Sequence, residues 1–181
     1  FECEDFSVSA FEVQHRGSES LGYVFEEKSR RPFLPEQAEA LGIPPGPIRR
    51  DLSSGLPVTL PDGRTISPED VLGPLRPGTR FVTIGDVGRT DGLLEHIRGA
   101  DGLVIEATYL QEEAELASDF GHLTARQAAE LAREGGVRQL FLTHISRRYR
   151  EKDVQAEAAA VFPNVVVARD FDSYQVRRDM V

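Results

Sequence analysis

Cysteine is almost absent from this sequence of 181 residues, which contains only Cys3. A single cysteine cannot form a disulfide within the chain, and it excludes zinc fingers built on several cysteines. No apolar run reaches the ~18 residues that a membrane-spanning helix needs, so we expect no transmembrane segment. The sequence also has no basic segment followed by an apolar stretch, the pattern of a secretory signal. We therefore expect a protein of the reducing cytoplasm.

Methionine is equally scarce, and its position bears on what the chain is. The sequence begins Phe1-Glu2-Cys3-Glu4, and its only methionine is Met180. Without an initiator methionine, we expect a fragment, a processed chain or one segment of a longer polypeptide. The function depends on this point, because a fragment need not contain a complete site.

Net positive charge is lacking too, since 21 Lys and Arg stand against 30 Asp and Glu and give a formal net charge of −9. Phosphate contacts need basic side chains, so this balance argues against indiscriminate nucleic-acid binding. Basic residues nevertheless gather in two places, residues 28–50 and residues 147–152. Each cluster can be a solvated surface or a binding patch, and charge alone leaves both interpretations open.

The remaining composition, 40% hydrophobic and 28% charged, is that of a globular protein whose length favours a single domain. Residues 29–79 differ from the rest because they hold ten of the eleven prolines. We expect only a short helix at Pro35–Leu41 and a hairpin pairing Val58–Leu60 with Arg64–Ile66 in this stretch. Long stretches with little regular structure are usually functional or disordered. Residues 29–79 are therefore either a protruding arm or a plain surface excursion.

Outside this stretch the hydrophobic pattern predicts strands that alternate with helices. Two strands, at residues 6–14 and Leu21–Phe25, precede the proline-rich stretch. The helix expected at Ala125–Glu134 has clear end signals, because Thr124 and Gln127 form a capping box before it and two glycines follow it. The order predicts an α/β fold with a largely parallel sheet. The other expected strands and helices, in chain order, are Arg80–Ile84, Asp91–Arg98, Gly102–Ile105, Gln139–Thr143, Val154–Val161 and Val165–Ala168.

Polar residues follow the ends of these strands. In open α/β sheets ligands bind at the carboxyl ends of the strands, where the sequence places Asp86, Glu106 and His144. His15 ends an earlier strand, and His122 lies just before the capped helix. Aspartate and histidine are suitable ligands for a divalent ion such as zinc, and bridging carboxylates are typical of two-metal phosphoesterases.

Each of these residues also has a structural interpretation. Asp86 alone could satisfy turn amides, and His144 alone could bond to the backbone. Glu106 is harder to explain in this way, because an acid at the end of an apolar strand needs a partner. Their joint position favours a functional site. His96, inside a predicted helix, is expected to be a solvated surface histidine.

Several motifs resemble the carboxyl-terminal half of the ribonuclease Z family, which are zinc-dependent tRNA 3′-processing endonucleases. The resemblance runs in order from about Phe6 to Tyr174. It implies the metallo-β-lactamase fold, an αββα sandwich with two metals at the sheet edge. The motifs are Leu41-Gly42-Ile43-Pro44-x-Gly46-Pro47, Asp62-Gly63-Arg64, Gly85-Asp86, Glu106-Ala107-Thr108, His122-x-Thr124 and Thr143-His144-Ile145-Ser146-x-Arg148-Tyr149.

The resemblance assigns a role to each residue of the expected site. It implies that His15 binds one metal, His144 binds the other and Asp86 bridges the two. Glu106 and His122 would form the acid–histidine pair that assists protonation of the leaving oxygen, since a carboxylate orients an imidazole and keeps it basic. The implied cofactor is Zn²⁺, two ions per complete site, with Mn²⁺ or another divalent ion as an alternative.

The resemblance also implies a substrate and contacts to it. Precursor tRNA would be gripped by the arm at about residues 29–60, and the protein would be a homodimer without a membrane partner. The implied substrate-binding residues are Arg148, Tyr149, Gly46, Pro47, Arg49 and Arg50.

Two departures from the family pattern are present. Val87 stands where the family usually has threonine after Gly-Asp, which affects the bonding expected around Asp86. The family's His-x-His-x-Asp-His loop, which supplies the remaining metal ligands, does not occur in the 181 residues. We therefore expect the chain alone to be inactive. Two alternatives remain: another phosphodiesterase or ester hydrolase of the same fold, and a metal-free RNA-binding module.

Overall fold

A computed structural model describes residues 1–178 and divides the chain into two compact units. The first, called here the sheet unit, comprises Phe1–Glu27 and the chain from Thr79 onward. The second, called here the insert unit, is Lys28–Gly78. No helix in residues 1–178 is both long enough and apolar enough to cross a membrane.

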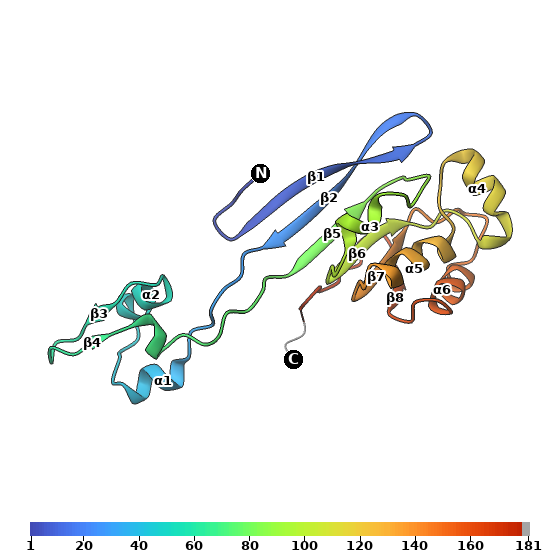
Figure 1. Cartoon of the computed structure of the whole chain (residues 1–181). Coiled ribbons are helices and arrows are strands. Elements are labelled where there is room, and N and C mark those ends of the chain that lie inside the picture. Colours follow the sequence, from blue (N-terminus) through green and yellow to red (C-terminus); the bar gives the residue numbers. More distant parts are fainter. Residues whose placement is uncertain (179–181) are drawn as a thin grey trace. The chain divides into compact units, whose positions relative to one another are not determined.

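The sheet unit is built on one six-stranded sheet with the order β1-β2-β5-β6-β7-β8 (Figure 1). The first three of these strands pair antiparallel, and β5 to β8 pair parallel. This arrangement confirms the largely parallel segment predicted from the alternating pattern. The strand bounds are β1 (Phe6–His15), β2 (Ser18–Glu27), β5 (Arg80–Ile84), β6 (Gly102–Glu106), β7 (Gln139–Thr143) and β8 (Val165–Val167).

Three helices cover one face of this sheet: α3 (Leu93–Ile97), α5 (Ala125–Glu134) and α6 (Glu151–Ala159). Alternate strand residues such as Val82, Leu103 and Leu140 point toward them and are fully buried, as the period of two in a strand requires. The alanines of α5 are buried in the same core, and small side chains let this helix lie close to the sheet.

The capping box predicted for α5 is present in both directions. The Thr124 hydroxyl accepts a hydrogen bond from the Gln127 N–H (3.1 Å), and the Gln127 side-chain oxygen accepts one from the Thr124 N–H (2.9 Å). This reciprocal bonding satisfies amides that a helix start leaves unpaired. It fixes where α5 begins, and therefore where the preceding His122 lies.

The expected elements include no helix between β6 and α5, and that prediction was wrong. This segment contains the 3₁₀ helix η2 (Gln111–Glu113) and α4 (Ala114–Phe120). The Glu157 carboxylate accepts hydrogen bonds from the backbone N–H of Gln111 (3.0 and 3.1 Å) and ties this segment to α6. Tertiary contacts of this kind stabilise a short helix that has little periodicity of its own.

His96 is not the fully solvated residue that the sequence suggested. Its ring stacks on Phe11 with 4.0 Å between ring centroids, and its side chain is 34% exposed. Phe11 in turn lies over Gly22, where an added Cβ would come within 2.3 Å of the ring. Only glycine allows this close approach between β1 and β2.

The insert unit has its own small core, formed by Ala38, Ile43, Leu52, Leu60, Ile66 and Val71. The predicted helix and hairpin are present, and an unpredicted second helix follows Gly46. Prolines occupy the first turn of each helix, where no amide partner is needed. The elements are α1 (Pro35–Ala40), α2 (Pro47–Ser53), β3 (Val58–Thr59), β4 (Thr65–Ile66) and the 3₁₀ helix η1 (Pro68–Asp70).

Candidate functional site

Glu106, the last residue of β6, is completely buried and accepts four hydrogen bonds. Its Oε1 lies 2.7 Å from the Val87 N–H nitrogen and 2.8 Å from Nδ1 of His122. Its Oε2 lies 2.7 Å from the Thr108 hydroxyl and 3.2 Å from the Leu123 nitrogen. These contacts supply the partners that a buried acid requires. The contact from position 87 is a backbone one, so valine makes it as well as threonine.

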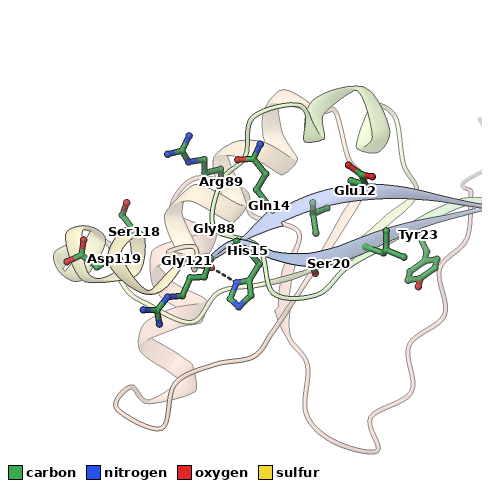
Figure 2. Close-up of a pocket in the computed structure, with 14 residues that line it drawn as sticks. Glu12, Gln14, His15, Ser20, Tyr23, Gly88, Arg89, Ser118, Asp119 and Gly121 are labelled. Atoms are coloured by element: carbon green, nitrogen blue, oxygen red, sulfur yellow. Dashed lines mark hydrogen bonds between the residues drawn. The ribbon is translucent and has the colours of Figure 1, made fainter.

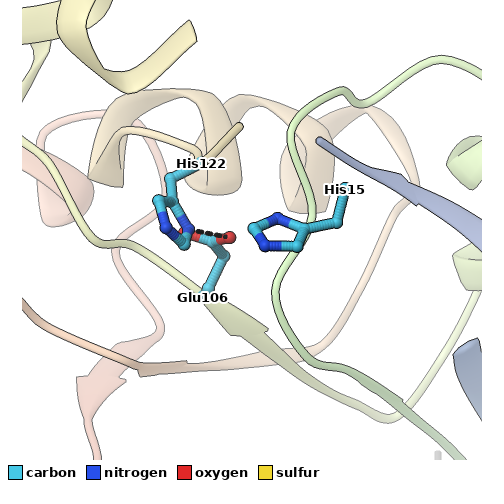
Figure 3. A group of neighbouring side chains, drawn as sticks. All are labelled: His15, Glu106 and His122. Carbon is cyan, nitrogen blue, oxygen red and sulfur yellow. Dashed lines mark hydrogen bonds and ion pairs between the residues drawn. The ribbon is translucent and has the colours of Figure 1, made fainter. Parts of the chain in front are cut away.

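His122 lies at the centre of the site. When Nδ1 donates to the Glu106 carboxylate, 2.8 Å away, the other ring nitrogen, Nε2, is left as a base or ligand. The His122 ring centroid lies 5.1 Å from that of His15 and 5.2 Å from that of His144. Figure 3 shows the His15 ring facing the Glu106–His122 pair. Three histidines from distant parts of the sequence are therefore brought together.

His144 follows β7 in a left-handed backbone conformation with φ of 55°. A positive φ is uncommon for residues other than glycine, so the surrounding structure must hold this conformation. The Thr108 hydroxyl lies 3.0 Å from the His144 carbonyl oxygen, and the same hydroxyl contacts Glu106. In this conformation Nε2 of His144 lies 3.6 Å from Oδ1 of Asp86.

His15 ends β1 and lines a cavity of about 1160 Å³. Its Nδ1 lies 2.8 Å from the Gly121 carbonyl oxygen, a contact drawn in Figure 2. The Gly88 N–H donates to the Gln14 carbonyl (2.7 Å), and an added Cβ on Gly88 would come within 2.9 Å of Gly121. Close backbone approaches thus hold the end of β1 against the loops that carry Asp86 and His122.

The residues present fit a divalent metal site. One ligand atom from each of Asp86, His122 and His144 lies within 4.8 Å of the others, and the same holds for His15, Glu106 and His122. Glu106 is a poor ligand, because four hydrogen bonds already occupy its buried oxygens. Asp86 and His144 are 43% and 49% exposed and offer accessible atoms. Asp86 and His144 therefore combine accessible donor atoms with closeness to His122, and His15 lies in the second group with Glu106 and His122.

Arg148 and Tyr149 lie in the turn between β7 and α6 and share one partner. The Tyr149 hydroxyl donates to the Glu113 carboxylate, and Nη1 of Arg148 lies 3.2 Å from the same carboxylate. Sequence reasoning assigned no role to Glu113, which lies in the segment between β6 and α5 where no helix was predicted. Nothing in the local pattern links residues 35 positions apart.

The insert unit contains the other expected substrate-binding residues. Gly46 has φ of 133° and immediately precedes Pro47, the first residue of α2. Arg49 is engaged within the unit: Nε and Nη2 donate to the Ile43 carbonyl (3.2 and 2.7 Å). Arg50 is exposed, and no ion pair or hydrogen bond of its side chain occurs within residues 1–178. Arg49 therefore has two of its nitrogen donors occupied, whereas the side-chain donors of Arg50 have no partner within residues 1–178.

The sequence matches a known family model and several named proteins. A family model described as "Beta-lactamase superfamily domain" matches residues 54–145, about half of the chain. A protein named Ribonuclease Z from Bradyrhizobium diazoefficiens is 50% identical over 167 residues, covering 92% of this chain and 56% of that protein. A Ribonuclease Z from Gemmatimonas aurantiaca is 46% identical over 170 residues, covering 92% and 54%. The chain thus spans little more than half the length of these relatives.

Solved structures share the fold at low sequence identity. The short form of human tRNase Z superimposes with a TM-score of 0.59 at 23% identity, covering 98% of this chain and 46% of that one. A metallo-beta-lactamase fold protein from Bacillus subtilis, YhfI, gives a TM-score of 0.59 at 16% identity, covering 93% and 49%. These values confirm the predicted fold class, and the curated relatives confirm the resemblance to ribonuclease Z. The chain belongs to the beta-lactamase superfamily and has the metallo-beta-lactamase fold.

Proposed function

We propose that the complete protein containing this chain is a metal-dependent endoribonuclease that matures the 3′ end of precursor tRNA. It would hydrolyse the phosphodiester bond beyond the discriminator nucleotide and leave a 3′-hydroxyl on the tRNA. The observation that carries this proposal is the buried Glu106–His122 pair, which lies between two histidines suited to metal binding. The relatives named Ribonuclease Z support the choice of substrate.

The metal ligands proposed within this chain are His15, Asp86 and His144. Three residues do not complete a two-metal site, so the remaining ligands would come from outside these 181 residues. Zn²⁺ is the proposed ion, because histidine and carboxylate ligands suit it, with Mn²⁺ as the alternative. When bound, divalent ions supply Lewis-acid stabilisation of the charge that develops during phosphodiester hydrolysis.

The proposed task of His122 is to protonate the leaving oxygen. As water attacks phosphorus, the bond to the 3′-oxygen of the tRNA breaks, and that oxygen takes a proton from Nε2 of His122. Glu106 holds the ring through Nδ1–H and stabilises the charged imidazolium before the proton leaves. The Thr108 hydroxyl and the Val87 and Leu123 amides keep the carboxylate in place.

Substrate binding is proposed to use two groups of residues. In the sheet unit, Arg148 and Tyr149 would contact phosphates near the cut. In the insert unit, Gly46, Pro47, Arg49 and Arg50 would form or support a surface for the body of the tRNA. We also propose a homodimer, as the same resemblance suggests, and a cytoplasmic location. Sedimentation of the complete protein tests the dimer.

The test is His144→Ala in the complete protein, assayed for cleavage of precursor tRNA and, separately, for binding to it. We expect cleavage to be abolished and tRNA binding to stay within about threefold of wild type, because a lost metal ligand removes chemistry rather than distant phosphate contacts. His96→Ala is the matched control, since His96 lies outside the site. Normal cleavage by the His144 variant would contradict the assignment.

A further inference from the structure

One carboxylate joins the two residues expected to contact RNA near the cut. Glu113 ends η2, while Arg148 and Tyr149 follow β7. Nη1 of Arg148 lies 3.2 Å and 3.4 Å from the two Glu113 oxygens, and the Tyr149 hydroxyl donates to one of them. The Tyr149 ring packs against the main core of the sheet unit. A chain of contacts therefore runs from the core through Glu113 to the Arg148 guanidinium.

This contact orients Arg148 without using all of its donors. A guanidinium has five N–H donors, and within residues 1–178 only Nη1 has a partner. Nε and Nη2 form the edge that binds a phosphate through two parallel hydrogen bonds. The Arg148 side chain is 55% exposed, so this edge can reach a ligand.

Neighbouring Arg150 shows the opposite arrangement. Its Nε and Nη2 already bind the Asp153 carboxylate at 2.7 and 3.2 Å. The edge that would bind a phosphate is therefore occupied by an acid of α6. Within the basic cluster at residues 147–152, Arg148 is therefore held through Nη1, whereas Arg150 is held through Nε and Nη2.

We propose that Glu113 is a positioning residue for RNA binding, holding Arg148 so that Nε and Nη2 bind a backbone phosphate of the substrate. This inference rests on the proposed function. It makes a prediction opposite to simple electrostatics, in which removing an acid strengthens binding to a polyanion. Here the removal of Glu113 frees a long side chain that must then be ordered at each binding event, so binding weakens.

The experiment measures the dissociation constant of precursor tRNA for the complete protein and its variants. We expect Glu113→Ala to weaken binding roughly three- to tenfold, and Glu113→Gln to weaken it less because the amide oxygen still accepts one bond. Glu112→Ala is the matched control: it removes the same charge from the adjacent exposed residue. It should leave binding unchanged or slightly tighter.

A double-mutant cycle separates positioning from a merely structural role. If Glu113 acts through Arg148, the Glu113→Ala/Arg148→Ala variant should bind no more weakly than Arg148→Ala alone. Both single variants should also lower the salt dependence of binding by roughly one phosphate contact. Additive losses, or binding by Glu113→Ala as tight as wild type, would overturn the proposal.

The same set of variants also separates misfolding, and failure of the proposed function, from failure of the role given to Glu113. If Glu113→Ala lowers the melting temperature so far that it cannot be assayed, Glu113→Gln replaces it in the cycle with the same expected non-additivity. Absence of precursor tRNA binding by the wild-type protein would instead remove the proposed function. Binding by wild type with equal effects of Glu112→Ala and Glu113→Ala would remove only the role of Glu113.

Discussion

The two ends of β6 each have a buried acid, and the two acids have different partners. Asp101 immediately precedes the strand and is 1% exposed, and Glu106 ends it and is completely buried. Asp101 accepts from the Arg80 N–H (2.8 Å) and pairs with Nε of Arg138 (3.1 Å). Glu106 pairs with His122. Arginine keeps its proton at all ordinary pH values, whereas histidine exchanges one near neutrality.

The two acids show how a carboxylate that stabilises the fold differs from one placed beside candidate reactive groups. Both carboxylates are buried, so burial alone does not distinguish them. Both oxygens of Glu106 have hydrogen-bond partners, whereas Oδ1 of Asp101 has ion pairs but no hydrogen bond within residues 1–178. The partner distinguishes them, together with the surroundings: the Glu106 end gathers His15, His122 and His144, and the Asp101 end gathers arginines. Removing each partner should therefore affect activity at one end of β6 and stability at the other.

The largest effect is expected from His122→Ala. In the complete protein, loss of the proposed general acid should lower the single-turnover cleavage rate of precursor tRNA by roughly 10²- to 10⁴-fold. The unfolding free energy should change by no more than about 1 kcal/mol, because Glu106 keeps three other hydrogen bonds. Chemical denaturation and a cleavage assay on the same preparation check both parts.

Arg138→Ala should give the reverse result. It leaves the buried Asp101 without its closest cationic partner, and we expect a loss of roughly 2–3 kcal/mol in unfolding free energy, moderated by the 39% exposure of Arg138. Cleavage per folded molecule should stay within about twofold of wild type. A large loss of activity in folded protein would show that the two ends of β6 are not separable.

Thr108→Val tests the hydroxyl that contacts both the Glu106 carboxylate and the His144 carbonyl oxygen. Valine keeps the shape but leaves one Glu106 oxygen with a single partner and frees the His144 carbonyl. We expect a stability loss of about 1–2 kcal/mol and a roughly tenfold slower cleavage step. Thr108→Ser, which keeps the hydroxyl, should restore most of both values. Failure of serine to do so would mean that the methyl group matters instead.

The smallest effects are expected in the insert unit, where Arg49 and Arg50 provide a similar contrast. Arg50→Ala should reduce the salt dependence of tRNA binding by roughly one contact without changing stability. Arg49→Ala should leave that slope unchanged and cost about 1 kcal/mol in stability, because Arg49 bonds the Ile43 carbonyl and lies over Phe33. Equal salt slopes for the two variants would contradict this division.

Strong local patterns let the sequence predict most of the sheet unit. Alternation in the strands and the capping box at Thr124 located β5, β7 and α5 with the bounds that the structure has. The strand ends also placed His15, Asp86 and His144 at one edge. Because carboxyl ends of parallel strands meet at the same edge, this part follows from topology.

Elements that depend on distant contacts were missed. The seven-residue helices α2 and α4 carry too few turns for a periodic signal, and tertiary packing stabilises them. The link from Glu113 to Arg148 and the bond from Arg49 to the Ile43 carbonyl are side-chain contacts that no local pattern encodes. The sequence therefore predicted which residues meet at the edge but not which neighbours hold them.

The role proposed for His122 is tested most directly in the complete protein with a precursor tRNA in which sulfur replaces the 3′-oxygen that leaves. A thiolate departs without a proton, so a variant lacking its general acid should no longer be impaired. We expect His122→Ala to cleave this substrate at a rate within a few-fold of wild type, although it is severely slowed on the natural one. An equally large defect on both substrates would show that His122 does not protonate the leaving group, and would contradict the distinction between the two ends of β6.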